Sequence, residues 1–218
     1  MKDKFLKAAA ITPDIKVGDT DFNTENIIKS MNIAHKQGVK LAVFPELVIS
    51  GYTCSDLFLQ DILLKGSLNG LKKIINASEN LDMITIVGLP FLFNFKLYNV
   101  AAVIFDGELL GIVPKQHIPN YSEFYEGRHF TPGEETVTEY QLSGREIPFG
   151  INLLFRCTEL PELVIGCEIC EDLWVAEPPS TSHALAGATV IANCSASDET
   201  TGKDAYRRSL ICGQSARL

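Results

Sequence analysis

The sequence lacks a basic cluster, an internal repeat and any apolar run long enough to cross a bilayer. Nothing in it therefore predicts a membrane span. Nucleic-acid binding depends on clustered Lys and Arg, so a formal net charge of −8 argues against that partner. The apolar residues 5–11 follow a charged start, but Lys7 interrupts them, and we expect a first strand rather than a signal peptide.

Cysteine is present, but not in a pattern that predicts disulfides. The six cysteines are irregularly spaced along the chain. A chain of 218 residues can bury roughly 70% of its unfolded surface, so it needs neither disulfides nor a structural metal to hold a core. We therefore expect one domain with reduced thiols and a cytoplasmic location.

Strand-like and helix-like segments alternate along the chain, which predicts an α/β fold. Short apolar runs predict strands at residues 5–11, 39–44, 83–87, 98–105, 109–113, 151–156, 163–169 and 188–193. Helical spacing predicts helices at residues 23–37, 55–77, 181–186 and 203–218. Ser55 is the expected N-cap of the second helix, and the Asp106-Gly107 pair predicts a hairpin turn.

Two stretches depart from this alternation. Residues 114–150 are rich in Pro, Gly, Tyr, Glu and His, and 37 residues are too many for an idle connector, so we expect functional loop surface there. The helical pattern at residues 203–218 stops without a cap or breaker. We expect a chain cut inside its domain or just before further strands.

Three reactive side chains stand at the ends of predicted strands, where α/β proteins gather their ligands. Glu46 and Lys115 each follow an apolar run and a proline, and Cys170 ends the run 163–169. Each alone also fits a solvated surface residue. Together they supply what thiol-dependent hydrolysis of a carbon–nitrogen bond needs, namely a nucleophile, a proton acceptor and a cation for the oxyanion.

Each of the three has an assigned role. A cysteine with a pKa of roughly 8.5 is only a few per cent thiolate at neutral pH, so Cys170 needs either a partner base, for which Glu46 is the candidate, or a neighbouring cation. Lys115 would stabilise the developing anion. A thiol at a sharp strand end also leaves the next backbone N–H, that of Glu171, to face the same oxyanion.

Longer motifs around these residues resemble the nitrilase, or carbon–nitrogen hydrolase, superfamily with its Glu-Lys-Cys triad. More narrowly, they are similar to the N-terminal glutaminase domains of glutamine-dependent NAD⁺ synthetases, over nearly the whole chain. The motifs are residues 44–52 (FPELVISGY), 114–126 (PKQHIPNYSEFYE), 168–174 (EICEDLW) and 178–180 (PPS).

The resemblance implies a reaction. Cys170 would attack the amide of glutamine and release ammonia, and a water activated by Glu46 would hydrolyse the γ-glutamyl thioester. Glu123 would be the second glutamate, which orients Lys115 and the substrate.

The resemblance also implies a substrate pocket, formed by Tyr52, Tyr121, Glu171, Ser197 and Lys203. The head group of glutamine carries both charges, so Glu171 would suit its ammonium and Lys203 its carboxylate. Relatives often carry Arg at the latter position, and a lysine is a point charge rather than a fork.

For the whole domain, the resemblance implies a four-layer α-β-β-α sandwich and a homo-oligomer. Residues 1–218 would be one glutaminase domain that lacks its C-terminal strands. The glutaminase reaction would need no cofactor. ATP and Mg²⁺ would belong to a separate ligase domain, and no Gly-x-x-x-x-Gly-Lys-Ser/Thr loop is present to bind ATP here.

Other hypotheses remain open on the residues alone. The Cys167-x-x-Cys170 spacing also occurs in redox and zinc sites, although alternation along a strand points these two residues to opposite faces. A Cys–His enzyme would use one of four histidines, of which His117 and His129 lie in the loop-rich stretch. The chain could also be an amidase for another small amide, or a silent docking module.

Overall fold

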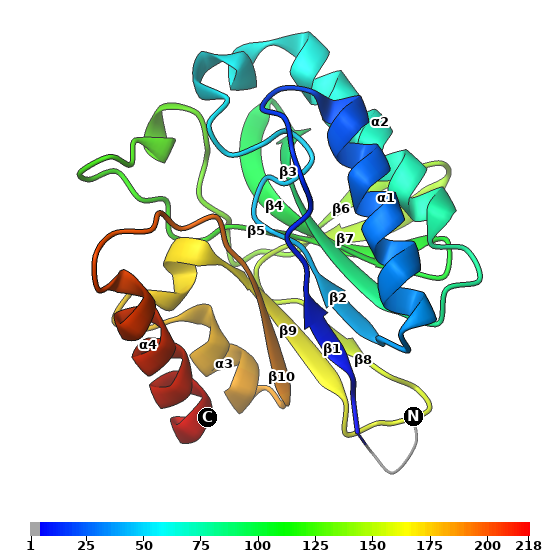
Figure 1. Cartoon of the computed structure of the whole chain (residues 1–218), viewed down its shortest axis with the longest axis vertical. Coiled ribbons are helices and arrows are strands. Elements are labelled where there is room, and N and C mark those ends of the chain that lie inside the picture. Colours follow the sequence, from blue (N-terminus) through cyan, green and yellow to red (C-terminus); the bar gives the residue numbers. More distant parts are fainter. Residues whose placement is uncertain (1–4) are drawn as a thin grey trace.

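Two β-sheets form the centre of the molecule in the computed structural model, which describes residues 5–218; the charged residues 1–4 lie outside this range (Figure 1). The larger sheet has the strand order β1 (Ala8–Ala10), β2 (Leu41–Val43), β3 (Ile84–Phe93), β4 (Lys96–Phe105), β5 (Glu108–Pro114), β7 (Arg145–Phe149) and β6 (Thr138–Leu142). The smaller sheet has the order β10 (Val190–Cys194), β9 (Val164–Ile169) and β8 (Leu154–Arg156).

Helices cover the outer face of each sheet, so the layers follow the order α, β, β, α (Figure 1). The helices are α1 (Thr20–Lys36), α2 (Asp61–Ala77), α3 (Pro179–Leu185) and α4 (Lys203–Arg217). Alternate residues of β3 face opposite layers: Val87 packs in one core with Ile27 of α1, and Ile86 packs in a second core with Ile165 of β9. The expected α/β fold and its four layers are confirmed.

Strand direction brings two of the candidate residues to one edge. Strand β2 pairs parallel with β3, whereas β4 is antiparallel to both β3 and β5. Strand β5 therefore runs in the same direction as β2. The carboxyl ends of both strands, which lead into Glu46 and Lys115, meet at the same end of the larger sheet.

Tight two-residue turns connect consecutive antiparallel strands of the larger sheet. The expected turn at Asp106-Gly107 is present, with φ values of 44° and 76°. Two further turns also have a positive φ at both residues: Asn94-Phe95 between β3 and β4, and Ser143-Gly144 between β6 and β7. The sequence does not predict the first of these, because a phenylalanine rarely adopts a left-handed conformation.

Helices α1, α2 and α3 begin at different residues from those expected, and α3 starts two residues early, at Pro179. Helix α1 starts three residues early, at Thr20, because the Asp19 carboxylate accepts the Phe22 backbone N–H at 3.0 Å. Ser55 is not the N-cap of α2: it has a φ of 50° and opens a separate 3₁₀ turn, Ser55–Leu59. The α-helix itself begins only at Asp61.

Regular structure is also present in the stretch 114–150. Strands β6 and β7 form a hairpin in its second half, and neither was among the expected strands. The first half contains one short 3₁₀ turn, Glu126–Arg128. Among residues 5–218, no helix is both long and apolar enough to span a membrane.

Candidate active site

Glu46 lies in a tight segment that passes directly over strand β3. Its side chain is buried, with 1% of the residue exposed. The segment fits only because residue 88 has no side chain: a Cβ there would lie 2.4 Å from the backbone nitrogen of Leu47 and 2.6 Å from the carbonyl oxygen of Pro45. Gly88 therefore sets how closely the Glu46 segment approaches the sheet.

Lys115 is fully buried and is held between two carboxylates. Its Nζ lies 2.7 Å from Oε1 of Glu46, and 2.8 and 2.9 Å from the two oxygens of Glu126. The amide of Asn99 on β4 donates to the same oxygen of Glu46 at 2.7 Å. Burial lowers the pKa of Lys115, but the charges of Glu46 and Glu126 outweigh it and raise the pKa above its usual value. The lysine is a permanent cation.

The second glutamate of the site is Glu126, and this corrects the assignment of Glu123. In the described chain, the carboxylates that contact Lys115 are those of Glu46 and Glu126. Glu123 instead lies in the loop near Asp198. Burial, followed by the charge of Glu46, raises the pKa of Glu126.

Cys170 follows directly on β9, in a strained backbone conformation with a φ of 45°. A left-handed conformation costs a non-glycine residue roughly 1–2 kcal/mol, and such strain clusters at functional sites. Burial, followed by the charge of Glu46, raises the pKa of the thiol to about 12, although Lys115 opposes this shift. At neutral pH the resting group is therefore the thiol, which must lose its proton to a base in order to react.

The loop after β10 joins the nucleophile to the base. The Ala196 backbone N–H donates to Oε2 of Glu46 at 3.3 Å and also faces the thiol of Cys170. The Ser195 hydroxyl lies 3.5 Å from Sγ of Cys170. Glu46, Lys115 and Cys170 therefore share one site, although the first two follow strands of the larger sheet and the third follows a strand of the smaller one.

A pocket of about 220 Å³ opens beside the thiol. Four of the five expected substrate-binding residues line it together with Cys170, namely Tyr121, Glu171, Ser197 and Lys203. The Tyr121 hydroxyl lies 2.9 and 3.0 Å from the two carboxylate oxygens of Glu171. An acid and a base thus stand in one small cavity, next to the nucleophile.

The base in this pocket is already partnered. Lys203 forms an ion pair with Asp198, and its Nζ lies 5.3 Å from the ring centre of Trp174 and 5.7 Å from that of Phe124. Two aromatic faces and one carboxylate therefore hold the ammonium group in place.

The fifth expected residue, Tyr52, lies outside this pocket. Its hydroxyl donates to Glu126 at 2.6 Å, and it lines a neighbouring cavity of about 270 Å³ together with Glu123. Tyr52 therefore contacts the Lys115 cluster through Glu126 rather than the space beside Cys170.

The competing thiol chemistries find no support in the geometry of residues 5–218. The ring of His129 faces Asp56 at 3.0 Å, and the backbone of His117 donates to Asp172, so neither is paired with the thiol. Cys167 is buried in the core between the sheets, and its burial raises its pKa to about 12. Over the same residues, no group of three or more His, Cys, Asp or Glu side chains is arranged to hold a metal ion.

Several residues of the site escaped sequence reasoning. Glu126 lies in a loop without periodicity, where one glutamate cannot be preferred to another three residues away. Asn99 is a polar residue within an apolar strand, and that is a signal that could have been used. Asn193, at the same kind of position in β10, could have been found in the same way.

Comparison with known proteins agrees with this geometry. Residues 7–211 match the family model described as carbon-nitrogen hydrolase. A glutamine-dependent NAD(+) synthetase of Mycobacterium tuberculosis is 41% identical over 213 residues, which are 98% of this chain but 31% of that protein. The chain thus spans about a third of the length of this relative.

Solved structures give the same result. A glutamine-dependent NAD(+) synthetase from Cytophaga hutchinsonii superposes with a TM-score of 0.85 at 29% identity, over 96% of this chain and 33% of that one. The enzyme of the same name from Acinetobacter baumannii, in complex with adenosine diphosphate, gives 0.73 at 26% identity, over 89% and 33%. The chain belongs to the carbon–nitrogen hydrolase family, and it is homologous to about one third of these synthetases.

Proposed function

We propose that this chain is a glutaminase that releases ammonia from the side-chain amide of L-glutamine through a thioester on Cys170. The observation that carries the proposal is the buried cluster of Glu46, Lys115 and Glu126 beside a thiol that opens into a small pocket with an acid and a base. Each group in that arrangement has a chemical task in amide hydrolysis.

The first half-reaction forms the acyl-enzyme. Glu46 takes the proton of the Cys170 thiol as Sγ attacks the carboxamide carbon. The carbonyl oxygen becomes an oxyanion, which the ammonium of Lys115 and the backbone N–H of Glu171 stabilise. When the intermediate collapses, the carbon–nitrogen bond breaks, and Glu46 returns its proton to the leaving amine, which departs as ammonia.

The second half-reaction restores the thiol. Glu46 removes a proton from water, the resulting hydroxide attacks the thioester carbonyl, and the carbon–sulfur bond breaks. The proton on Glu46 then passes to the thiolate. The sum is glutamine plus water giving glutamate plus ammonia, and no cofactor takes part.

The pocket favours an amide that carries an amino-acid head group. Glu171 has the charge to hold an ammonium, and the Tyr121 hydroxyl fixes its orientation. Lys203 has the charge to hold a carboxylate, which would share the lysine with Asp198. A simple aliphatic amide or a nitrile carries neither charge, so it would form no ionic contact with Glu171 or Lys203.

The similarity to glutamine-dependent NAD(+) synthetases supports a wider proposal. The ammonia would serve an ATP- and Mg²⁺-dependent ligase that amidates deamido-NAD⁺, in a domain distinct from residues 1–218. The six free cysteines support a reducing, cytoplasmic compartment. A homo-oligomer rests on the family resemblance, and light scattering after size-exclusion chromatography tests it.

Ammonia release is the test of the central proposal. The purified chain is incubated with L-glutamine, L-asparagine, a simple aliphatic amide and a nitrile, and ammonia is measured beside the Cys170→Ala variant. We expect release from glutamine well above the variant's background, with a trapped γ-glutamyl adduct on Cys170 by mass spectrometry.

The other outcomes select among the alternatives. Preference for the aliphatic amide would identify an amidase for another substrate. Release no faster than from Cys170→Ala with every compound would identify a docking module without catalysis.

A further inference from the structure

The turn that carries Cys170 is held by side chains rather than by the sheet. Two consecutive backbone N–H groups at this turn donate to side-chain oxygens: that of Ile169 to Asp172 at 3.0 Å, and that of Cys170 to Asn193 at 3.1 Å. A strained backbone persists only where its surroundings fix it. The acceptors of these two N–H groups therefore control where the thiol points.

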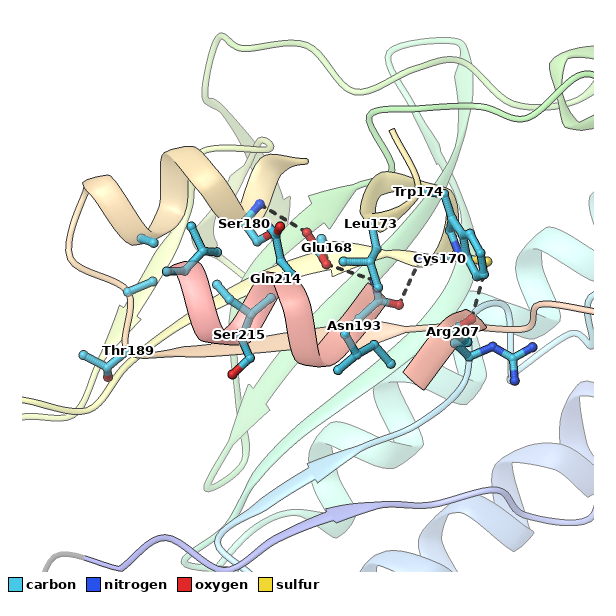
Figure 2. A pocket seen from close by; sticks show the side chains of 16 residues that line it. Glu168, Cys170, Leu173, Trp174, Ser180, Thr189, Asn193, Arg207, Gln214 and Ser215 are labelled. Atoms are coloured by element: carbon cyan, nitrogen blue, oxygen red, sulfur yellow. Dashed lines mark hydrogen bonds between the residues drawn. The ribbon is translucent and has the colours of Figure 1, made fainter. Parts of the chain in front are cut away.

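Behind Asn193 lies a buried carboxylate that the reaction steps do not use. Glu168 is 2% exposed and accepts two hydrogen bonds, from the Asn193 amide at 3.1 Å and from the Ser180 backbone N–H at 3.1 Å. Figure 2 shows this chain of contacts running from Ser180 through Glu168 and Asn193 to Cys170.

The carboxylate of Glu168 determines which group donates and which accepts in each of these hydrogen bonds. A carboxylate only accepts hydrogen bonds, so Asn193 must turn its NH₂ group toward Glu168. Its carbonyl oxygen then faces the N–H of Cys170. With the amide reversed, an NH₂ group would oppose an N–H, and two donors cannot bond to each other.

Packing alone does not hold Asn193 in this orientation. A cavity of about 600 Å³, lined by Glu168, Cys170 and Asn193 among others, lies on one side of the chain of contacts (Figure 2). An amide that borders open space keeps its orientation through its hydrogen bonds.

We propose that Glu168 and Asn193 are positioning residues: Glu168 fixes the orientation of the Asn193 amide, and Asn193 holds the Cys170 backbone so that its thiol faces Glu46 and Lys115. This inference rests on the proposed function, because it assigns these residues to the same hydrolysis.

Single substitutions break the pattern of donors and acceptors without changing the shape of the side chains. In Glu168→Gln two amides face each other, and in Asn193→Asp two carboxylates do. Since a misplacement of about 1 Å can cost about 100-fold in rate, we expect each to lower kcat at least about tenfold while KM stays within about threefold.

The double variant Glu168→Gln/Asn193→Asp exchanges the amide and the carboxylate and keeps the net charge. The new amide at position 168 still accepts from Ser180 and donates to position 193, where the new carboxylate accepts from Cys170. We expect kcat to return to within about tenfold of the wild type. A double variant no better than the poorer single one would overturn the proposal.

A control variant measures the effect of a Glu→Gln substitution in an amide–carboxylate pair outside the active site. Gln141 donates to Glu146 at 3.2 Å in an exposed amide–carboxylate pair on the β6–β7 hairpin. Glu146→Gln makes the same substitution there and should leave kcat unchanged. If a single variant does not melt cooperatively, the double variant provides the test. The double variant must both fold and hydrolyse glutamine, and a loss of folding or of activity in it counts against the proposal.

A second readout does not depend on glutamine. Alkylation of Cys170 by iodoacetamide, followed by peptide mass spectrometry, reports the thiol in the absence of substrate. Glu168→Gln removes a negative charge, so simple electrostatics predicts faster alkylation, whereas loss of positioning predicts slower alkylation, at least about threefold. Faster alkylation would refute the inference. If the wild type releases no ammonia but these alkylation rates behave as expected, it is the proposed function that fails.

Discussion

The exchange of Glu126 for glutamine tests the identification of the second glutamate. The substitution leaves the size of the side chain unchanged but removes one of the two negative charges on a fully buried lysine, with contacts of 2.8 and 2.9 Å. Breaking a buried ion pair costs about 3–5 kcal/mol, and since Glu46 remains and the new amide oxygen still accepts, we expect about 1–2 kcal/mol. For a chain of this size the melting temperature should fall by about 3–6 °C.

The effect of Glu126→Gln on activity should be larger than its effect on stability. Lys115 would be free to shift toward Glu46 and away from the oxyanion, and a displacement of about 1 Å can cost about 100-fold in kcat. The Tyr52 hydroxyl would also lose its charged acceptor. Ammonia release from glutamine gives kcat and KM, and a thermal melt gives the stability.

Glu123→Gln is the matched control, three residues away in the same loop. Glu123 lies near Asp198, which pairs with Lys203, so we expect a KM increase of up to about threefold with little change in kcat. If Glu123→Gln loses about 100-fold in kcat while Glu126→Gln stays within about threefold of the wild type, the reasoning is wrong.

Three further results are expected. Because burial and Glu46 raise the pKa of Cys170 to about 12, the alkylation rate of its thiol should rise about tenfold per pH unit from pH 7 to 9. The Glu46→Gln variant should be alkylated faster at pH 7, yet it should hydrolyse the substrate about 1,000-fold more slowly or worse. Slower alkylation of that variant would contradict the role of Glu46 in raising the pKa. Gly88→Ala should prevent folding, as seen by circular dichroism, because its Cβ would lie 2.4 Å from a backbone nitrogen. The control Gly213→Ala, in α4 with open space around it, should stabilise the protein by up to about 1 kcal/mol. A folded, active Gly88→Ala variant would disprove the close approach. Burial raises the pKa of Asp172 to about 7, so its contribution to stability is present below pH 4 or so and is lost as pH rises through 7. In urea titrations at pH 5 and 8, the wild type should lose about 2 kcal/mol more than Asp172→Asn, and equal losses would argue against the shift.

Much of the fold is predictable from the sequence because the apolar patterns are local. Strand β9 is apolar except for Glu168, and helix α4 has its helical spacing from Lys203 onward. Register and strand order are not local properties. The sequence gives no signal that β5 pairs with β7 through a single pair, Ile112 with Phe149, so the β6–β7 hairpin stayed hidden in a stretch rich in loop residues.

The residues of the candidate site likewise fall into those that a local sequence pattern predicts and those that it does not. Glu46, Lys115 and Cys170 follow apolar runs, so their positions carry a structural meaning that sequence reasoning can use. Glu126 comes from a segment without a periodic pattern, and its position depends on tertiary contacts such as its own ion pair with Lys115. The backbone conformation of Cys170 was equally hidden, because no sequence pattern requires a positive φ at a cysteine.

Because the site is divided between two sheets, the packing of the apolar layer between them determines the distances between the catalytic groups. The base and the cation belong to one sheet and the nucleophile to the other, so a sliding of the sheets by a fraction of an ångström changes the proton-transfer distance. Buried methyl groups such as those of Val103 and Ile165, which do not contact a substrate, thereby set the position of Cys170 relative to Glu46 and Lys115. Substitutions in this layer are expected to alter turnover before they reduce the stability of the fold.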